Sequence, residues 1–287
     1  MAHVVATINL KGGVGKTTTT AALAEVLSAE FGQKVLLIDL DPQTNLTMMM
    51  IGERRWGELD AEGLTLATVF ERELTGTPGW FDIDLLIEQG VSPLSKVDTV
   101  DLLPSSLKLI ALQDRVAALG EGVDGDHTQI LQRALGDVLD RYDYVLIDCP
   151  PNLGAMTLNG LRLADGYLIP TIPDVMSTYG IGPVQERIRQ FATEWGGPIV
   201  ELGVVVTKYR KVSAVHRNTI DDLVRNKEIS MVFPSLIPDA NQIAAAAEFA
   251  NFGTLRQKYG SDGQFTALRD LAQDFMATAK IKLAWSR

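Results

Sequence analysis

One short stretch near the N-terminus carries residue types suited to binding phosphate. It reads Lys11-Gly12-Gly13-Val14-Gly15-Lys16-Thr17-Thr18 and follows an apolar run. Glycines allow successive backbone N–H groups to converge on an anion, and the N-terminus of a following helix adds its positive end. The Lys16 ammonium would reach the β- and γ-phosphates of a nucleotide, and the Thr17 hydroxyl would bind Mg²⁺. A plain surface turn rarely combines these residues, so the stretch predicts a phosphate-binding loop.

Three aspartates follow two other apolar runs. Asp148 ends one run, where a carboxylate is costly to bury unless it is paired, and Mg²⁺ with its waters is a suitable partner. Asp39 and Asp41 end the other run two positions apart, so their side chains share one side of a strand while Leu40 faces away. The alternatives are a helix cap for Asp148 and two solvated loop acids for the pair.

The scaffold that would hold these residues follows from the alternation along the chain. Short β-branched and apolar runs alternate with helical periodicity, which is typical of an α/β fold with a mainly parallel twisted sheet and helices on both faces. Strands are expected at Val4–Asn9, Val35–Asp39, Val100–Leu103, Tyr144–Asp148, Gly166–Pro170, Val200–Val206 and Met231–Ile237. Helices are expected at Lys16–Glu30, Leu107–Leu119, Gln129–Arg141, Ala155–Ala164, Ile181–Trp195, Ala214–Asn226, Ile243–Phe249 and Gln264–Leu283.

Composition limits the classes of protein. The 287 residues are 46% hydrophobic and 22% charged, which is typical of a globular chain, and we expect one domain over residues 1–287. The single cysteine, Cys149, excludes a disulfide framework and any cluster of thiolates. No apolar run reaches the ~18 to 20 residues of a membrane span, so a cytosolic protein is expected.

Charge is distributed unevenly along the chain. Residues 53–126 hold 15 acidic and 6 basic side chains, and an irregular acidic insertion at the sheet edge is expected over about 52–97. A basic cluster lies later, beyond the strand expected at Val200–Val206. Its members are Lys208, Arg210, Lys211 and Arg217, with Arg225 and Lys227 further along. Such a cluster favours weak contacts with nucleic-acid phosphates, with a solvated helix face as the alternative.

The motifs together resemble the deviant Walker A P-loop ATPases of the ParA/MinD family. The usual loop G-x-x-x-x-G-K-[ST] has glycine where this chain has Leu10, and the family's KGGxGKT pattern matches from Lys11 to Thr17. The resemblance covers most of the chain except the acidic insertion and the last helix, and the partition branch fits best. Further matching stretches are Leu37–Asn45, Leu102–Ser106, Val145–Pro151, Leu168–Thr171 and Leu236–Pro238.

The resemblance implies a role for each residue of the motifs. Asp41 positions or polarises the attacking water, and Asp39 supports the Mg²⁺ ion that Thr17 and Asp148 bind. Lys11 reaches across a dimer interface to the partner's nucleotide, so dimerisation would require ATP. Ligands of such sheets sit beyond the carboxyl ends of the strands. We therefore expect adenine contacts from Thr207, Lys208, Pro238 and Asp239.

The function implied is an ATP-switched positioning protein. Its ATP-bound homodimer would bind DNA nonspecifically through Lys208, Arg210, Lys211 and Arg217, in a cytoplasmic, nucleoid-associated location. A stimulating adaptor or centromere-binding protein would trigger hydrolysis, and the cargo would be a plasmid, a chromosome or a protein body such as a carboxysome. No helix-turn-helix extension precedes the loop, so specific operator binding is not expected.

Other classes in the same superfamily are less well matched. A MinD-like membrane-associated regulator is the alternative function, but Ile281, Leu283 and Trp285 of the tail alternate at strand-like spacing and form no helical stripe. Nitrogenase-reductase-like electron carriers need two cluster cysteines and fail on Cys149 alone. Metabolic amidoligases remain open, although the sequence shows no motif for their substrates.

Overall fold

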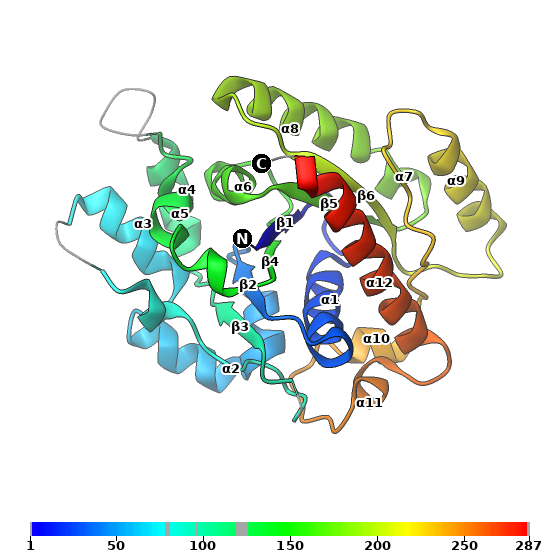
Figure 1. Cartoon of the computed structure of the whole chain (residues 1–287), viewed down its shortest axis with the longest axis horizontal. Helices are drawn as coiled ribbons and strands as arrows, with labels where there is room; N and C mark the ends of the chain where they lie inside the picture. Colours follow the sequence, from blue (N-terminus) through cyan, green and yellow to red (C-terminus); the bar gives the residue numbers. More distant parts are fainter. Residues whose placement is uncertain (1, 78–80, 96, 119–125, 286–287) are drawn as a thin grey trace.

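A computed structural model describes residues 2–77, 81–95, 97–118 and 126–285 of the chain. The expected α/β fold is confirmed: its six described strands form one sheet in the order β3-β2-β4-β1-β5-β6, and every neighbouring pair is parallel (Figure 1). The strands are β1 (His3–Thr7), β2 (Val35–Asp39), β3 (Val100–Leu103), β4 (Tyr144–Asp148), β5 (Gly166–Thr171) and β6 (Val200–Val206).

The register of the central strands aligns the ends that carry the motifs. Thr7 at the end of β1 pairs with Asp148 at the end of β4, and Asp148 also pairs with Asp39 at the end of β2. All three strands run in the same direction, so the loop after β1 and both aspartates meet at the carboxyl edge of the sheet.

Helices cover both faces of the sheet, as the apolar strands require. Figure 1 shows the helices around the sheet. Val4 and Ala6 of β1 pack into one core cluster with residues of α6 (Ala155–Leu163) and α8 (Ile181–Trp195), whereas Val5 packs into a second cluster with residues of α1 (Lys16–Phe31) and α12 (Gln264–Lys282). The helices are α1 (Lys16–Phe31), α2 (Asn45–Ala61), α3 (Leu66–Thr75), α4 (Leu109–Ala118), α5 (Ile130–Leu135), α6 (Ala155–Leu163), α7 (Val175–Thr178), α8 (Ile181–Trp195), α9 (Ala214–Arg225), α10 (Asn241–Ala245), α11 (Leu255–Tyr259) and α12 (Gln264–Lys282). Short 3-10 helices are η1 (Ile83–Leu86), η3 (Leu139–Arg141) and η4 (Leu283–Trp285).

The seventh expected strand does not form. Met231 and Phe233 exchange backbone hydrogen bonds with Val204 of β6, and Ile237 donates to Val206. Between these contacts the chain leaves the sheet edge at Pro234, which has no N–H to continue a ladder. The prediction of a strand over Met231–Ile237 was wrong because one proline outweighs an otherwise apolar run.

Several helices differ from expectation in length. The helix expected at Gln129–Arg141 ends at Leu135 and resumes as the 3-10 turn Leu139–Arg141, with Gly136 at the break. The expected Ile243–Phe249 helix is the shorter α10, and Leu119, the expected end of the helix that forms as α4, lies outside the described residues. The apolar side chains Ile130, Leu131 and Leu135 of α5 are nevertheless buried.

The segment expected to be irregular over 52–97 is helical in its first part, up to Thr75, and beyond that its described residues hold only the short 3-10 helix η1. Helix α2 continues through Gly52, whose φ of 76° marks a kink, and α3 follows it. Leu66 and Phe70 of α3 are fully buried, so an amphipathic helix prevails over the glycines and prolines that favoured a loop.

The part of the chain that the structure describes holds no helix of the length and apolarity needed to span a bilayer. In the tail, Ile281 is exposed while Leu283 is buried, so these two side chains do not form one exposed apolar stripe.

Candidate nucleotide-binding site

The loop between β1 and α1 has the backbone of an anion cradle. Gly13 and Gly15 have φ of 74° and 87°, a region that glycine adopts without strain, and Gly15 caps the N-terminus of α1. A Cβ built on Gly12 or Gly13 would meet no atom within 4 Å, so the space above this backbone is open to a ligand. The N-terminal amides of α1 face the same space.

Lys16 is the buried cation of this loop. Its side chain is almost covered, and Nζ donates to the carbonyl oxygen of Lys11 at 3.4 Å. Burial lowers the pKa of Lys16, while attraction by Asp148 and Asp41 opposes that shift. A phosphate anion beside Nζ would therefore complete the pairing of a charge that the fold has already removed from water.

Thr17 and Asp148 form the most direct contact between the loop and β4. The Thr17 hydroxyl donates to Asp148 Oδ2 at 2.6 Å, while the buried Oδ1 of Asp148 has no hydrogen-bond partner in the described structure. Burial, then repulsion from Asp39, raises the pKa of Asp148 well above its usual value. The described residues contain no group of three His, Cys, Asp or Glu side chains able to hold a metal alone. One hydroxyl and one orphaned carboxylate oxygen fit Mg²⁺, which retains several waters.

Asp39 is fully buried, and both its oxygens already accept hydrogen bonds. Oδ2 accepts from the N–H and hydroxyl of Thr47 at 2.9 and 2.7 Å, and Oδ1 accepts from Asp41 N at 3.2 Å. Burial raises the pKa of Asp39 to about 7. This geometry suits a residue that fixes the chain from Asp41 to Thr47 better than a direct metal ligand.

Asp41 lies at the phosphate end of the site. Its Oδ1 accepts from Gln43 N at 2.9 Å, and the two residues line a cavity of ≈ 430 Å³. The same cavity is lined by Gly12, Gly13, Gly15, Lys16, Thr17, Thr18, Asn45, Met48, Met49, Pro151, Lys208 and Ala247. The predicted loop residues other than Lys11 and Val14 thus share one cavity with Asp41, and the Val14 side chain is fully buried.

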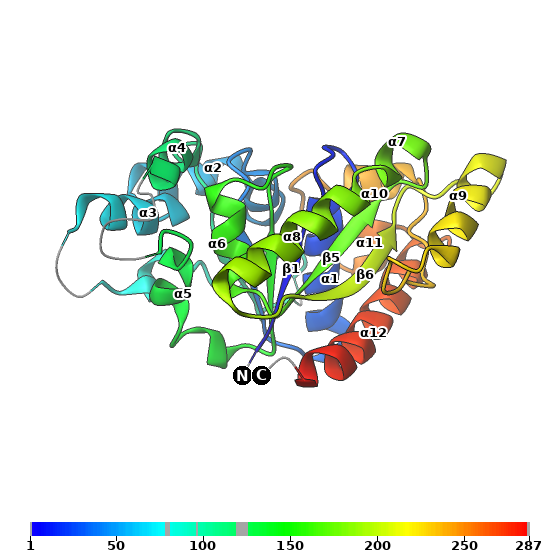
Figure 2. The same ribbon diagram turned by 90° about the horizontal axis from the view of Figure 1, so that it is seen from above.

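The Lys11 side chain contacts α7 of its own chain. Nζ donates to Ser177 Oγ at 2.8 Å and lies 3.7 Å from Asp174 Oδ1. Asp174 caps α7 by accepting from Ser177 N, and Figure 2 shows α7 at the same edge of the molecule as the loop after β1. Beside this contact, Val175, Met176 and Tyr179 are exposed large apolar side chains.

A second cavity of ≈ 270 Å³ adjoins the first, with Gly15, Thr18 and Lys208 common to both. It brings together all four residues expected to contact adenine, Thr207, Lys208, Pro238 and Asp239. Sequence reasoning missed its apolar wall from α10, Ile243 and Ala244, because nothing but their apolarity marked them. Thr207 Oγ1 donates to Val14 O at 2.7 Å, and Lys208 Nζ donates to Gly13 O at 2.8 Å.

The basic cluster expected to bind nucleic acid divides in two. Lys208 turns toward the phosphate loop, and Arg210 Nε donates to Asp239 Oδ2 at 2.6 Å beside the second cavity. Lys211 and Arg217 remain exposed near the start of α9, where the Arg217 guanidinium bonds to Lys211 O.

The sheet, the glycine loop and the buried lysine define a P-loop NTPase. A protein-family model described as an AAA domain matches residues 2–198. The chain belongs to this AAA domain family, as one of its ParA/MinD-type ATPases. The chromosome-partitioning ATPase Soj of Thermus thermophilus is 30% identical over 273 residues, 95% of both chains. An uncharacterized protein of Mycobacterium tuberculosis, Rv1708, is 36% identical over 208 residues, 72% of this chain but only 58% of that relative's length.

Solved structures show the same fold. Cobyrinic acid a,c-diamide synthase from Mycobacterium smegmatis, with bound ATP analog and magnesium, superposes with a TM-score of 0.75 and 25% identity over 98% of this chain and 96% of that one. Apo McdA from Cyanothece superposes with a TM-score of 0.77 and 22% identity over 96% and 99%.

Proposed function

We propose that this chain is an ATP-dependent partition or positioning ATPase that binds ATP with Mg²⁺ in the two adjoining cavities. The observation that carries the proposal is the junction of Lys16, Thr17 and Asp148 at the carboxyl edge, where a buried cation and an orphaned carboxylate oxygen face one open glycine loop. The ATP analog and magnesium of the mycobacterial synthase support the choice of ligand.

Different residues of this chain have different roles in ATP hydrolysis. Glycine-loop amides and Lys16 hold the phosphates, and Asp41 orients the attacking water. Thr17 and Asp148 would hold Mg²⁺, which would supply positive charge beside the phosphates. The Asp39 carboxylate keeps Asp41 in place by accepting a hydrogen bond from Asp41 N. The adenine base binds in the second cavity, the base cavity, against Thr207, Lys208, Pro238 and Asp239.

ATP also switches the chain between monomer and homodimer in this proposal. Lys11 leaves Ser177 and reaches the partner's nucleotide, where it stabilises charge on the transferred phosphoryl group. The exposed Val175, Met176 and Tyr179 support a protein contact at this place, because large apolar side chains at one exposed turn gain from burial.

DNA binding follows from dimerisation. Lys211 and Arg217 supply few phosphate contacts per monomer, and two rigidly joined patches gain by effective concentration. A partner protein stimulates hydrolysis and releases the dimer from the nucleoid. The chromosome-partitioning ATPase Soj, a relative of this chain, supports partition or positioning as the class of function, and the proposed cargo is a plasmid, a chromosome or a protein body.

The nucleotide proposal is tested by calorimetry with Mg²⁺ and ATP. Lys16→Ala should abolish binding, while Lys280→Ala, on the exposed face of α12, should bind like wild type. ATP affinity within about twofold of wild type in Lys16→Ala would show that the glycine loop is not the site.

DNA binding is tested separately with Lys211→Glu/Arg217→Glu. Arg210 is left unchanged because it pairs with Asp239 in the base cavity. The double variant should lose ATP-dependent binding to any duplex and keep ATP affinity, whereas Arg187→Glu/Arg189→Glu on α8 should bind DNA normally. Undiminished DNA binding by the first variant would place the DNA surface elsewhere.

A further inference from the structure

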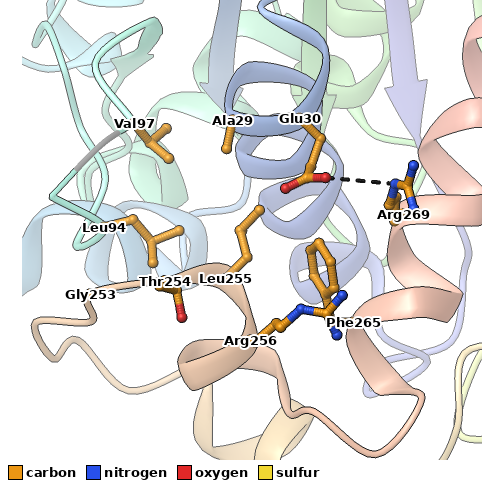
Figure 3. A pocket seen from close by; sticks show the side chains of 10 residues that line it. All are labelled: Ala29, Glu30, Leu94, Val97, Gly253, Thr254, Leu255, Arg256, Phe265 and Arg269. Carbon is orange, nitrogen blue, oxygen red and sulfur yellow. Dashed lines mark ion pairs between the residues drawn. The ribbon is translucent and has the colours of Figure 1, made fainter.

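A third cavity of ≈ 360 Å³ lies away from the nucleotide site, and its volume is within the range of small-molecule sites. Ala29 and Glu30 line it from the last turn of α1, about 20 Å along that helix from the phosphate loop. Figure 3 shows its other walls, which come from α11, from α12 and from the chain around Leu94.

The interior of this cavity is apolar. Leu94, Val97, Leu255 and Phe265 line it and are each at most 6% exposed, so their side chains are firmly packed. A ligand body of aromatic or branched aliphatic type would gain by covering the apolar surface left open between them.

The charges at the rim are unequal. Arg269 Nε lies 3.6 Å from Glu30 Oε2, so these two charges offset each other (Figure 3). The Arg256 guanidinium lies 4.7 Å from the centre of the Phe265 ring, and it forms no ion pair within the described ranges. One exposed guanidinium is therefore uncompensated beside an apolar cavity.

We propose that this cavity binds a small monocarboxylate with a flat apolar body. Its carboxylate pairs with Arg256, since guanidinium groups bind carboxylates in a bidentate fork. The apolar body lies against Leu94 and Leu255, with its edge toward Phe265. Because Glu30 and Arg269 offset each other, the rim keeps one positive charge, so a monoanion neutralises it whereas a phosphate dianion leaves one negative charge unpaired.

Three probes of one shape test the choice of ligand. 2-Naphthoate should bind saturably, with a Kd of about 1 mM or lower by ligand-observed NMR. 2-Naphthalenemethanol, which is neutral, and 2-naphthyl phosphate, a dianion, should each bind about tenfold more weakly. Equal binding of the three probes, or no saturable binding of 2-naphthoate, would overturn the proposal.

Variants test the location. Arg256→Gln should weaken 2-naphthoate about tenfold or more, and Ala29→Trp, an exposed rim position, should block the cavity without disturbing the core. Arg189→Gln on α8 should bind 2-naphthoate like wild type. Saturating ADP with Mg²⁺ should leave 2-naphthoate binding unchanged. Displacement by ADP, or wild-type affinity in both Arg256→Gln and Ala29→Trp, would show that the probe binds elsewhere.

Discussion

Lys11 donates a hydrogen bond from Nζ to Ser177 Oγ over 2.8 Å, so the lysine proposed to act on a partner's nucleotide rests on α7 of its own chain. Asp174 lies 3.7 Å from the same ammonium. Formation of the proposed dimer must break both contacts, and the intramolecular contacts compete with dimerisation.

Weakening this competition should favour the dimer. Ser177→Ala removes the hydroxyl that accepts from Lys11 and keeps the N–H that Asp174 caps. A partly exposed contact of this kind contributes about 0.5 to 1 kcal/mol, and a dimer breaks it once in each protomer. The ATP-dependent dimer should therefore form at about five- to thirtyfold lower protein concentration in sedimentation experiments. Lys11→Ala should lose the dimer and keep ATP binding. A dimerisation constant for Ser177→Ala equal to that of wild type would contradict the competition.

Asp41→Ala should separate ATP binding from hydrolysis. Its side chain lines the phosphate cavity but is not part of the glycine loop, so ATP affinity should persist. Phosphate release should fall about a hundredfold or more if this carboxylate positions the water. Asp221→Ala, a substitution at an exposed position of α9, is the control and should hydrolyse ATP like wild type. Unchanged turnover in Asp41→Ala would show that Asp41 has no role in hydrolysis.

The pH dependence of stability should have the reverse of the usual sign for an aspartate. Burial raises the pKa of Asp39 to about 7, against 3.8 for the ordinary group. Between pH 3.8 and about 7, the Asp39 carboxyl keeps its proton in the folded chain but has released it in the unfolded chain. The free energy of unfolding therefore falls as the pH rises through this range. The melting temperature without nucleotide should decline between about pH 4 and pH 7 and level off above that range. Asp39→Asn should reduce the dependence of the melting temperature on pH. An unchanged pH dependence in this variant would show that another group causes it.

A buried ion pair joins α1 to α11, the helix that lines the third cavity. Glu25 and Lys258 are both fully covered, with Nζ 2.8 Å from Oε1, and Tyr259 OH donates to Oε2 at 2.7 Å. Lys258→Met should destabilise the protein by about 3 to 5 kcal/mol in urea unfolding, because it leaves Glu25 buried without its cation. Glu25→Gln in the same chain should recover part of the loss, and equal stabilities of the single and double variants would contradict this account.

Sequence reasoning predicted which local parts of the chain meet at the candidate site. The glycine loop, Asp39, Asp41 and Asp148 each follow an apolar run, and parallel strands bring such run ends together. The adenine expectation also rested on strand ends, and all four residues line one cavity.

The features that the sequence did not predict depend on contacts between distant residues or on competing local preferences. Glu25 and Lys258 meet across 233 positions, and no local pattern marks that pair. The resting place of Lys11 depends on a one-turn helix at Asp174 that has no long periodicity. At Met231–Ile237, apolar content predicted a strand, and the backbone chemistry of Pro234 prevented it.

The two bonds from Thr207 and Lys208 to the phosphate loop have a consequence for nucleotide selection. They join the wall formed by Thr207 and Lys208 to the loop that would hold the triphosphate, so little conformational entropy is lost there on binding. A cradle organised in this way should hold ADP and ATP with similar affinity. The Asp41 and Lys11 side chains are not held by these two bonds, so they would have to discriminate between the two nucleotides.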